Sequence, residues 1–432
     1  MKAMYSVSTA WQRILVIGFI VTTFLLFIFS YLTGNLYPLQ IVFFIYAIHR
    51  LRILYYANKG RKKGLHPVIY SDFPSITAVI AAKNEEDVIE NSILSIMKSD
   101  YQGFFELYVI NDQSTDGTQC VVENLLPRFP NLHLINRTER PGKGGALNDV
   151  LAITKSSIMA VFDADSYIEP DFFTKSVPYF YRGKNVAGVQ SKVSIYNKDQ
   201  NHLTDLQHEE FSEFVKVAQS GKSYYSGAVG LGGNGQLTIV KAVKEVGGWT
   251  EGHLVDDLDL SIRLNINGYN IVYQDVVTVT QEAVSTFKAF IRQRTRWATG
   301  NIQCFSMYLP SIWASGMSLN KKIDWTLVLL VSTPFVILFS YGSTLAVLLH
   351  AFIIKSSPPF AFIIFNQLIY LGYMLYVFWQ SGSRNPFKII GKFFWRYVYS
   401  LHWFIVMTSG LWKSLTKKKI KWDKTVHIGK GG

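Results

Sequence analysis

Two clusters of charged side chains, one after the other in the chain, are the residues best suited to chemistry. The first cluster places three aspartates within four positions, Asp256, Asp257 and Asp259. The second places three arginines directly before Trp297, namely Arg292, Arg294 and Arg296. A carboxylate can take a proton from a hydroxyl group, and arginine binds phosphate through paired N–H donors. Together the clusters predict an enzyme that deprotonates one group and neutralises phosphate on another.

Asp257 is the candidate general base of the first cluster. Leu258 and Leu260 alternate with the carboxylates, and apolar walls around a carboxyl group raise its pKa. The alternative is that acids open a helix here, because carboxylates favour helix N-termini. That alternative applies most directly to Asp256 and Asp259.

Three side chains of the second cluster share one helical face. Gln293, Arg296 and Trp297 follow the i, i+3, i+4 spacing. Arg296 suits a diphosphate, and Trp297 offers a stacking surface for a sugar ring. The alternative is a helix at a membrane surface, with Arg292 and Arg294 meeting lipid headgroups.

A pair of carboxylates, Asp163 and Asp165, follows a strongly apolar segment. Such a pair can hold a hard divalent cation, which in turn can bridge two phosphates. A solvated acidic turn explains the pair equally well.

Two glycine-rich stretches are the remaining candidates. Residues 141–148 carry Lys143 at the start of an expected helix, where backbone N–H groups and the lysine favour an anion. Residues 230–236 contain four glycines around Asn234, and glycine such as Gly233 permits close approach of a ligand. A flexible loop and a plain tight turn are the respective alternatives.

The elements that position these residues alternate between strand and helix. Strands are expected at 76–82, 105–110, 132–135 and 157–162, with helices at 85–97, 118–126 and 147–154. This order predicts an α/β domain with a mostly parallel sheet and helices on both faces. Because such sheets bind ligands at the carboxyl ends of their strands, the polar residues 83–85, 111–112 and 163–165 are expected at one edge.

Composition predicts a membrane part on either side of this domain. Hydrophobic residues make up 49% of the 432 residues and charged residues only 17%. The net charge is +13, and the basic residues flank apolar segments, which indicates contact with lipid rather than with nucleic acid. Spans are expected at 11–32, 37–54, 325–353, 358–380 and 390–412. Both flanks of the last segment are basic, which predicts that both of its ends are cytoplasmic. The last segment is therefore either interfacial or re-entrant, or the number of spans differs from the five expected here. Cys120 and Cys304 show no metal-ligand or disulfide spacing.

The domain boundaries follow from these segments. We expect an N-terminal membrane region at 1–56, a cytoplasmic catalytic domain at 70–285, interface helices at 286–320, a C-terminal membrane region at 321–415 and a basic cytoplasmic tail at 416–432. The protein is accordingly expected in the plasma membrane as a multi-pass protein.

In this order the residues resemble the processive family 2 glycosyltransferases, such as the cellulose, chitin, hyaluronan and poly-N-acetylglucosamine synthases. The resemblance implies a GT-A fold inserted between transmembrane helices. It implies that the nucleotide base is bound by Asn84, Glu85 and Asp112, and the donor further by Lys143, Asp163, Gln293 and Arg296. It implies that Asp165 and Asp163 bind Mg²⁺ or Mn²⁺ and that Asp257 is the general base of the reaction. It also implies that the acceptor is contacted by Gly233, Asn234, Asp256 and Trp297.

The expected reaction is inverting polymerisation of a UDP-sugar, first UDP-glucose, into a β-glucan that passes through the protein's own channel. Several positions depart from the family pattern, including Ala81-Ala82-Lys83, Asn111-Asp112 and Val255-Asp256-Asp257. Three alternatives therefore stay open: a polymer of N-acetylglucosamine, a non-processive transfer to a lipid acceptor, and a nucleotide-sugar or lipid binder without turnover. The partners are the UDP-sugar, the growing polysaccharide and the bilayer, with accessory secretion subunits left undetermined.

Overall fold

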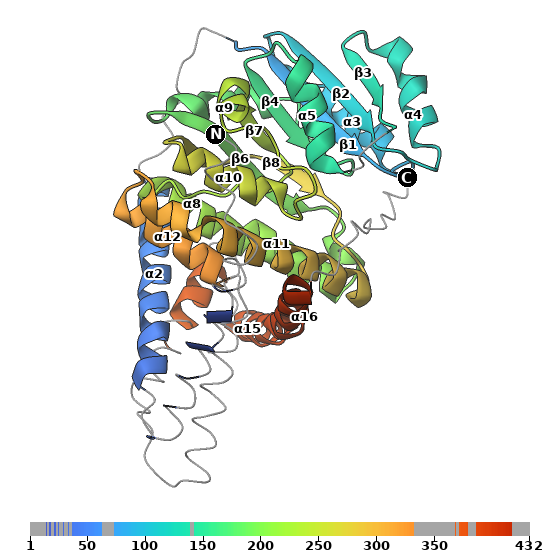
Figure 1. Cartoon of the computed structure of the whole chain (residues 1–432). Helices are drawn as coiled ribbons and strands as arrows, with labels where there is room; N and C mark the ends of the chain where they lie inside the picture. The colour runs from blue at the N-terminus through green and yellow to red at the C-terminus, as the bar shows by residue number, and fades with distance from the viewer. Residues whose placement is uncertain are drawn as a thin grey trace.

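The computed structural model describes residues 37–62, 73–138, 142–331, 371–378 and 386–416, with a few single positions between 14 and 33 and Leu368. A sheet with covering helices forms one end of the molecule (Figure 1). Long helices pack beneath it, and α2 (Tyr37–Lys62) extends away from it.

One mixed sheet of eight strands organises the described catalytic region. The strands are β1 (Ile76–Ala82), β2 (Phe105–Asn111), β3 (Leu132–Asn136), β4 (Ile158–Phe162), β5 (Tyr167–Ile168), β6 (Val186–Ile195), β7 (Gln236–Ile239) and β8 (Asn270–Gln281). Their order is β3-β2-β1-β4-β7-β6-β8-β5. The first four strands in sequence pair in parallel, whereas β7 is antiparallel to both β4 and β6. The four predicted strands are confirmed, and the second half of the sheet was not predicted.

Helices cover both faces of the sheet, as predicted. On one face α3 (Ile89–Met97) and α4 (Thr118–Leu125) contribute Ile93 and Val122 to a core with Ile80. On the other face α5 (Lys143–Ile153) contributes Leu147 to a core with Val161, together with residues of α9 (Val240–Glu245) and α10 (Asp256–Ile266). α5 begins four residues before the predicted start, because Gly142 has φ +143° and turns the chain into the helix at Lys143.

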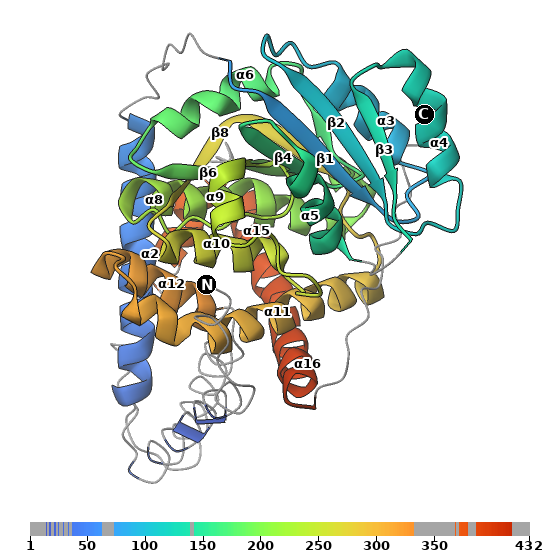
Figure 2. The same ribbon diagram turned by 45° about the horizontal axis from the view of Figure 1, so that its top comes forward.

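A layer of helices lies below the sheet. It contains α7 (His202–Glu209), the π-helix η5 (Glu210–Val215), α8 (Lys216–Tyr225), α11 (Phe287–Ala314), α12 (Leu319–Val331), α15 (Pro386–Ser400) and α16 (His402–Thr416). α11 packs against α12, α16 and α10, and α8 packs against α2. The short α6 (Phe172–Ser176) lies against β8. In Figure 2, α15 and α16 follow one another and cross beneath α11.

The predicted membrane spans have different outcomes. Most of 11–32, 325–353 and 358–380 lies outside the described residues. The segment 37–54 is helical as part of α2, but no described helix combines the length and apolarity that a crossing requires. In α2 the hydropathy is lowered by His49, Arg50 and Arg52. The predicted segment 390–412 is two helices of 15 residues, because the helix breaks at Leu401.

Candidate active site

The carboxyl ends of β1, β2 and β4 bring the predicted polar residues to one edge of the sheet. In the parallel register Ala82 pairs with Asn111, and Ile80 pairs with Phe162. Asn84 has φ +57°, and its Oδ1 accepts the N–H of Thr115 at 2.6 Å. The N–H of Glu85 donates to the Thr118 hydroxyl at 2.7 Å. These contacts join the turn after β1 to the loop after β2.

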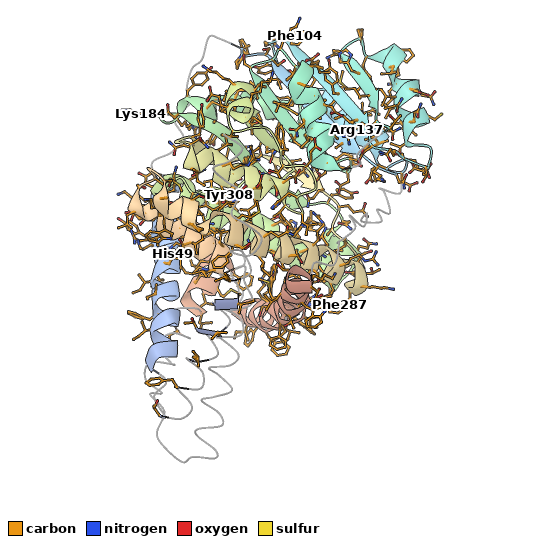
Figure 3. All side chains as sticks on the ribbon, in the orientation of Figure 1. His49, Phe104, Arg137, Lys184, Phe287 and Tyr308 are labelled. Carbon is orange, nitrogen blue, oxygen red and sulfur yellow. The ribbon has the colours of Figure 1, made fainter. Side chains whose placement is uncertain are left out.

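Asp112 is held by two donors that come from the segment after β3. Arg137 donates to Oδ1 at 2.8 Å, and the N–H of Gly142 donates to Oδ2 at 2.6 Å. Arg137 also bonds Asp149 of α5 at 2.7 Å, and Figure 3 shows it beside this end of the sheet. The sequence reasoning did not single out Arg137. Its place one residue after the end of β3 was the available signal.

Lys143 connects three of the predicted segments. Its Nζ lies 2.5 Å from Oδ1 of Asp163 and donates to the carbonyl of Gly233 at 2.9 Å. Burial alone would lower the pKa of Lys143, but the charges of Asp163, Asp256 and Asp257 together raise it above its usual value. The glycine-rich start of α5, the end of β4 and the loop before β7 therefore converge on one ammonium group.

Asp163 and Asp165 differ in their surroundings. The Asp163 side chain is 41% exposed, whereas Asp165 is 4% exposed and its Oδ2 accepts the N–H of Glu282 at 2.8 Å. Carboxylate oxygens of this kind suit Mg²⁺ or Mn²⁺. Among the described residues no group of three or more His, Cys, Asp or Glu side chains is placed to hold an ion.

The loop at 230–235 closes over the acids. Oδ1 of Asn234 accepts the Ser166 hydroxyl at 2.8 Å, which joins the loop to the turn after β4. Gly233 has φ +75°, and a Cβ added there would lie 3.1 Å from Oδ2 of Asp257. Glycine is favoured at this position both by the backbone conformation and by the close approach to Asp257.

Asp257 lies in the first turn of α10 beside Asp256. Its Oδ1 accepts the N–H of Leu258 at 2.8 Å. Burial, and then the charge of Asp256, raise the pKa of Asp257 to about 7, against the lowering effects of the Leu258 N–H, Lys143 and Arg296. One oxygen of Asp256 is buried without a hydrogen-bond partner among the described residues. A carboxyl group that titrates near neutrality suits a general base.

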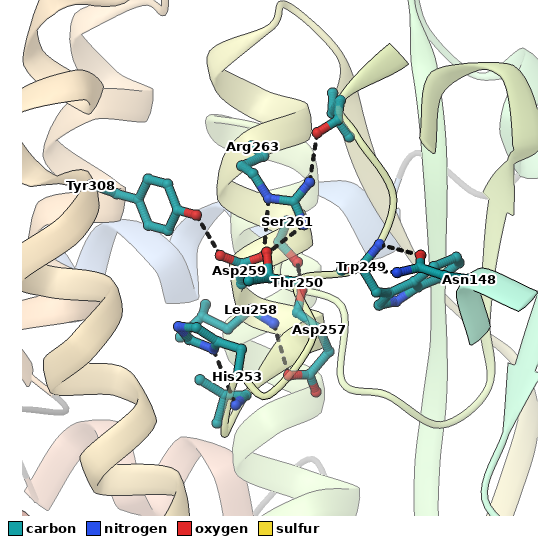
Figure 4. A network of polar contacts seen from close by, with 12 residues as sticks. Asn148, Trp249, Thr250, His253, Asp257, Leu258, Asp259, Ser261, Arg263 and Tyr308 are labelled. Atoms are coloured by element: carbon teal, nitrogen blue, oxygen red, sulfur yellow. Dashed lines mark hydrogen bonds and ion pairs between the residues drawn. The ribbon is translucent and has the colours of Figure 1, made fainter. Parts of the chain in front are cut away.

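Asp259 has a different role from the helix cap expected of it. It is fully buried, pairs with Arg263 at 2.6 Å and accepts the Thr250 hydroxyl at 2.7 Å and the Tyr308 hydroxyl (Figure 4). Burial alone would raise the pKa of Asp259, but Arg263 and the hydrogen bonds hold it below its usual value. Asp259 therefore joins α10 to α11 instead of capping α10.

α11 carries the predicted face of Gln293, Arg296 and Trp297. Arg296 donates to the carbonyl of Leu254 at 2.9 Å. Burial lowers its pKa, against the attraction of Asp257, Asp256 and Asp163. Its guanidinium therefore belongs to the same charge cluster as Lys143. Gln293 is half-buried one turn earlier.

Contact with lipid headgroups was the alternative considered for Arg294, and for this residue that alternative is wrong. The side chain is 1% exposed and donates to Glu210 at 2.8 Å. Its guanidinium carbon lies 4.3 Å from the centre of the Trp297 ring, and Phe211 contacts that ring edge-on. The Arg294 guanidinium thus packs against the Trp297 ring, whereas the Arg292 side chain is exposed.

Comparison with known proteins assigns the chain to a family. Residues 74–300 match the family described as "Glycosyltransferase like family 2". The β-monoglucosyldiacylglycerol synthase of Nostoc sp. (strain PCC 7120) is 31% identical over 400 residues, which cover 89% of this chain and 82% of that protein. The enzyme of the same name from Synechocystis sp. (strain PCC 6803) is 31% identical over 365 residues, covering 82% of this chain and 75% of that protein.

A solved structure shares the fold. The mannosyltransferase PcManGT from Pyrobaculum calidifontis, in complex with GDP-Man and Mn²⁺, superimposes with a TM-score of 0.60 at 19% identity. The match covers 88% of this chain and 99% of that one. It shows that the sheet and its helices form the GT-A fold.

Proposed function

This chain belongs to the family 2 glycosyltransferases, and we propose that it transfers one glucosyl residue from UDP-glucose to the free hydroxyl of a diacylglycerol, with inversion to a β-glucoside. Glycosyl transfer as such follows from family membership. The acceptor is proposed because both relatives described above are named for a lipid that carries one glucose. The polymer expected first has no such support, so the lipid alternative replaces it.

The observation that carries the chemistry is the convergence on Asp257. Lys143 and Arg296 lower its pKa, Gly233 leaves room beside its Oδ2, and burial with Asp256 raises its pKa to about 7. In the proposed step Asp257 takes the proton from the acceptor hydroxyl as the oxygen attacks the anomeric carbon. The bond from that carbon to the diphosphate oxygen breaks, and UDP leaves with the electron pair. One displacement inverts the configuration.

Cationic groups of the chain would hold the diphosphate. Lys143 and Arg296 both place positive charge near the Asp257 carboxylate, and such charge stabilises a leaving diphosphate. Asp163 and Asp165 would hold Mg²⁺ or Mn²⁺, which when bound neutralises phosphate charge. Asp112 with Arg137, and Asn84 with Glu85, would form the nucleotide end of the site. Trp297, supported by Arg294 and Phe211, would contact the acceptor.

Product analysis tests this proposal. Purified protein in detergent is given UDP-glucose and dioleoylglycerol with Mg²⁺ or Mn²⁺, and the lipid extract is analysed by mass spectrometry and by digestion with a β-glucosidase. We expect one glucose per lipid, cleaved by the β-glucosidase and lost when a chelator removes the metal. A product of many sugars that stays in the aqueous phase would instead support the polymer. Parallel reactions with UDP-N-acetylglucosamine, and without acceptor, control for donor choice and hydrolysis.

A further inference from the structure

An apolar stripe runs along one side of α15 and continues onto α16. Its large side chains are exposed and follow one another at intervals of three or four residues: Phe387, Ile390, Phe394, Val398, Leu401 and Ile405. Phe387 is 83% exposed and Ile390 64%. Side chains at this spacing lie on one face of a helix. The exposed side chains therefore form an apolar face on each of the two helices.

The opposite side of these helices is fixed to the catalytic part. Lys392 pairs with Glu209 at 2.5 Å, and the Tyr399 hydroxyl donates to Glu210 at 2.6 Å. Arg396 donates to the carbonyl of Leu206 at 3.2 Å. Because these contacts set the rotation of α15, the apolar stripe faces away from α7 and η5.

The charged residues of this segment indicate that the stripe contacts an anionic lipid surface. Residues 386–416 contain three lysines and one arginine, and no aspartate or glutamate. Trp395 and Trp412 are 47% and 64% exposed beside the stripe. An apolar face with aromatic residues and only basic charges is typical of helices that lie in the headgroup region of an anionic bilayer.

The length of the helices agrees with a position along the surface. Each has 15 residues, which at 1.5 Å per residue gives about 22 Å, against about 30 Å for the hydrocarbon core of a bilayer. α15 ends at Ser400 and α16 begins at His402, so neither helix by itself is long enough to cross.

We propose that α15 and α16 lie flat on an anionic bilayer, with this stripe inserted at the level of the glycerol backbone, and that they bring the site to its lipid acceptor. The second part rests on the proposed function. α16 packs directly on the turn of α11 that contains Trp297 and Ala298: a Cβ at Gly410 would lie 3.2 Å from the Cβ of Ala298, and Val406 and Met407 share a core with Ala298. Trp297 is therefore about one helix diameter, roughly 10 Å, from the bilayer surface.

Depth-resolved quenching tests the position of the stripe. Single cysteines are introduced by Ile390→Cys, Phe394→Cys, Val398→Cys and Ile405→Cys in the full chain, with exposed Cys120 replaced by serine and buried Cys304 retained. Each is labelled with an environment-sensitive fluorophore and reconstituted into vesicles of phosphatidylcholine and phosphatidylglycerol. The lipids carry bromine either near the glycerol or near the terminal methyl group. Phe104→Cys is the control, since Phe104 is 63% exposed at the end of the sheet far from α16 (Figure 3).

We expect all four labels to be quenched mainly by bromine near the glycerol, and the Phe104→Cys label by neither lipid. Quenching that deepens steadily from position 390 to position 405 would overturn the proposal, because the segment would then cross the bilayer. Four unquenched labels would also overturn it, because water, a second copy or another protein would then cover the stripe. The measurement needs no turnover, so it can fail while lipid glucosylation succeeds, and the reverse.

A second experiment tests acceptor delivery. The double variant Phe394→Ser/Val398→Ser is compared with wild type on dioleoylglycerol in the same vesicles and on water-soluble dihexanoylglycerol. We expect the rate on vesicles to fall about tenfold, because two membrane-inserted side chains are lost, with the rate on the soluble acceptor unchanged. Equal rates on vesicles for both proteins would contradict the delivery role.

Discussion

Tyr308 of α11 donates its hydroxyl hydrogen to Asp259 of α10, so the helix that carries Asp257 is bonded to the helix that carries Arg296. The same carboxylate accepts the Thr250 hydroxyl, and the neighbouring Trp249 exchanges two hydrogen bonds with Asn148 of α5. α5 begins with Lys143. The helices that carry Asp257, Arg296 and Lys143 are thus joined by one network of hydrogen bonds, and Figure 4 shows its part around Asp259, Trp249 and Asn148.

Asp259→Asn should strongly destabilise the protein. The change leaves the Arg263 guanidinium, 5% exposed, without its charge partner, which typically costs about 3–5 kcal/mol. Tyr308→Phe removes one hydrogen bond to a charged group and should cost about 1.5–3 kcal/mol. The matched control is Asp171→Asn, because Asp171 and Lys175 form an i, i+4 pair at the surface. Thermal unfolding in detergent measures the loss of stability in each variant, which should be largest for Asp259→Asn and smallest for Asp171→Asn. Equal stability of all three variants would contradict this prediction.

Asp257→Asn should abolish transfer while donor binding persists. The amide keeps the shape of the side chain but cannot accept the acceptor proton, so kcat should fall by about 100-fold or more. Titration calorimetry with UDP should show binding as in wild type. Asp275→Asn, at an exposed position of β8, serves as the control and should keep full activity. Undiminished transfer by Asp257→Asn would exclude this residue as the base.

The pH dependence of transfer should report the raised pKa of Asp257. A base must be deprotonated, so kcat/KM should rise with pH and level off above about 7. Asp256→Asn removes the neighbouring negative charge, which should move this rise to lower pH. Lys143→Met removes a positive charge and should move it to higher pH. Rate profiles of the three proteins test the assignment, and a midpoint that neither substitution moves would point to another group.

Gly233→Ala should lower kcat more than the matched substitution Gly252→Ala. Its Cβ would lie 3.1 Å from Oδ2 of Asp257, at a backbone φ of +75°. Gly252→Ala is the matched control: its φ is +72°, but nothing lies within 4 Å of the added Cβ. Both variants carry about 1 kcal/mol of backbone strain, so the difference in kcat isolates the contact with Asp257. Equal activities would mean that this contact is unimportant.

Local patterns in the sequence were sufficient for the first half of the sheet. Short apolar runs that alternate with helical segments predicted β1 to β4, and β1 has the predicted bounds. The parallel order then placed Asp112 and Asp163 at one edge of the sheet. The helical period likewise placed Gln293, Arg296 and Trp297 on one face of α11. The chemical roles of these residues stay predictions.

Packing between distant segments decided the rest. The pairings of Glu210 with Arg294, of Asp112 with Arg137 and of Asp259 with Tyr308 join residues with no common sequence pattern. The mixed half of the sheet, β5 to β8, and the break at Leu401 were also not predicted. A side chain's charge and spacing are local properties, whereas its partner and its burial depend on how the elements pack. For this reason the sequence by itself determined which groups could do chemistry, and only the tertiary structure decided which of them meet around Asp257.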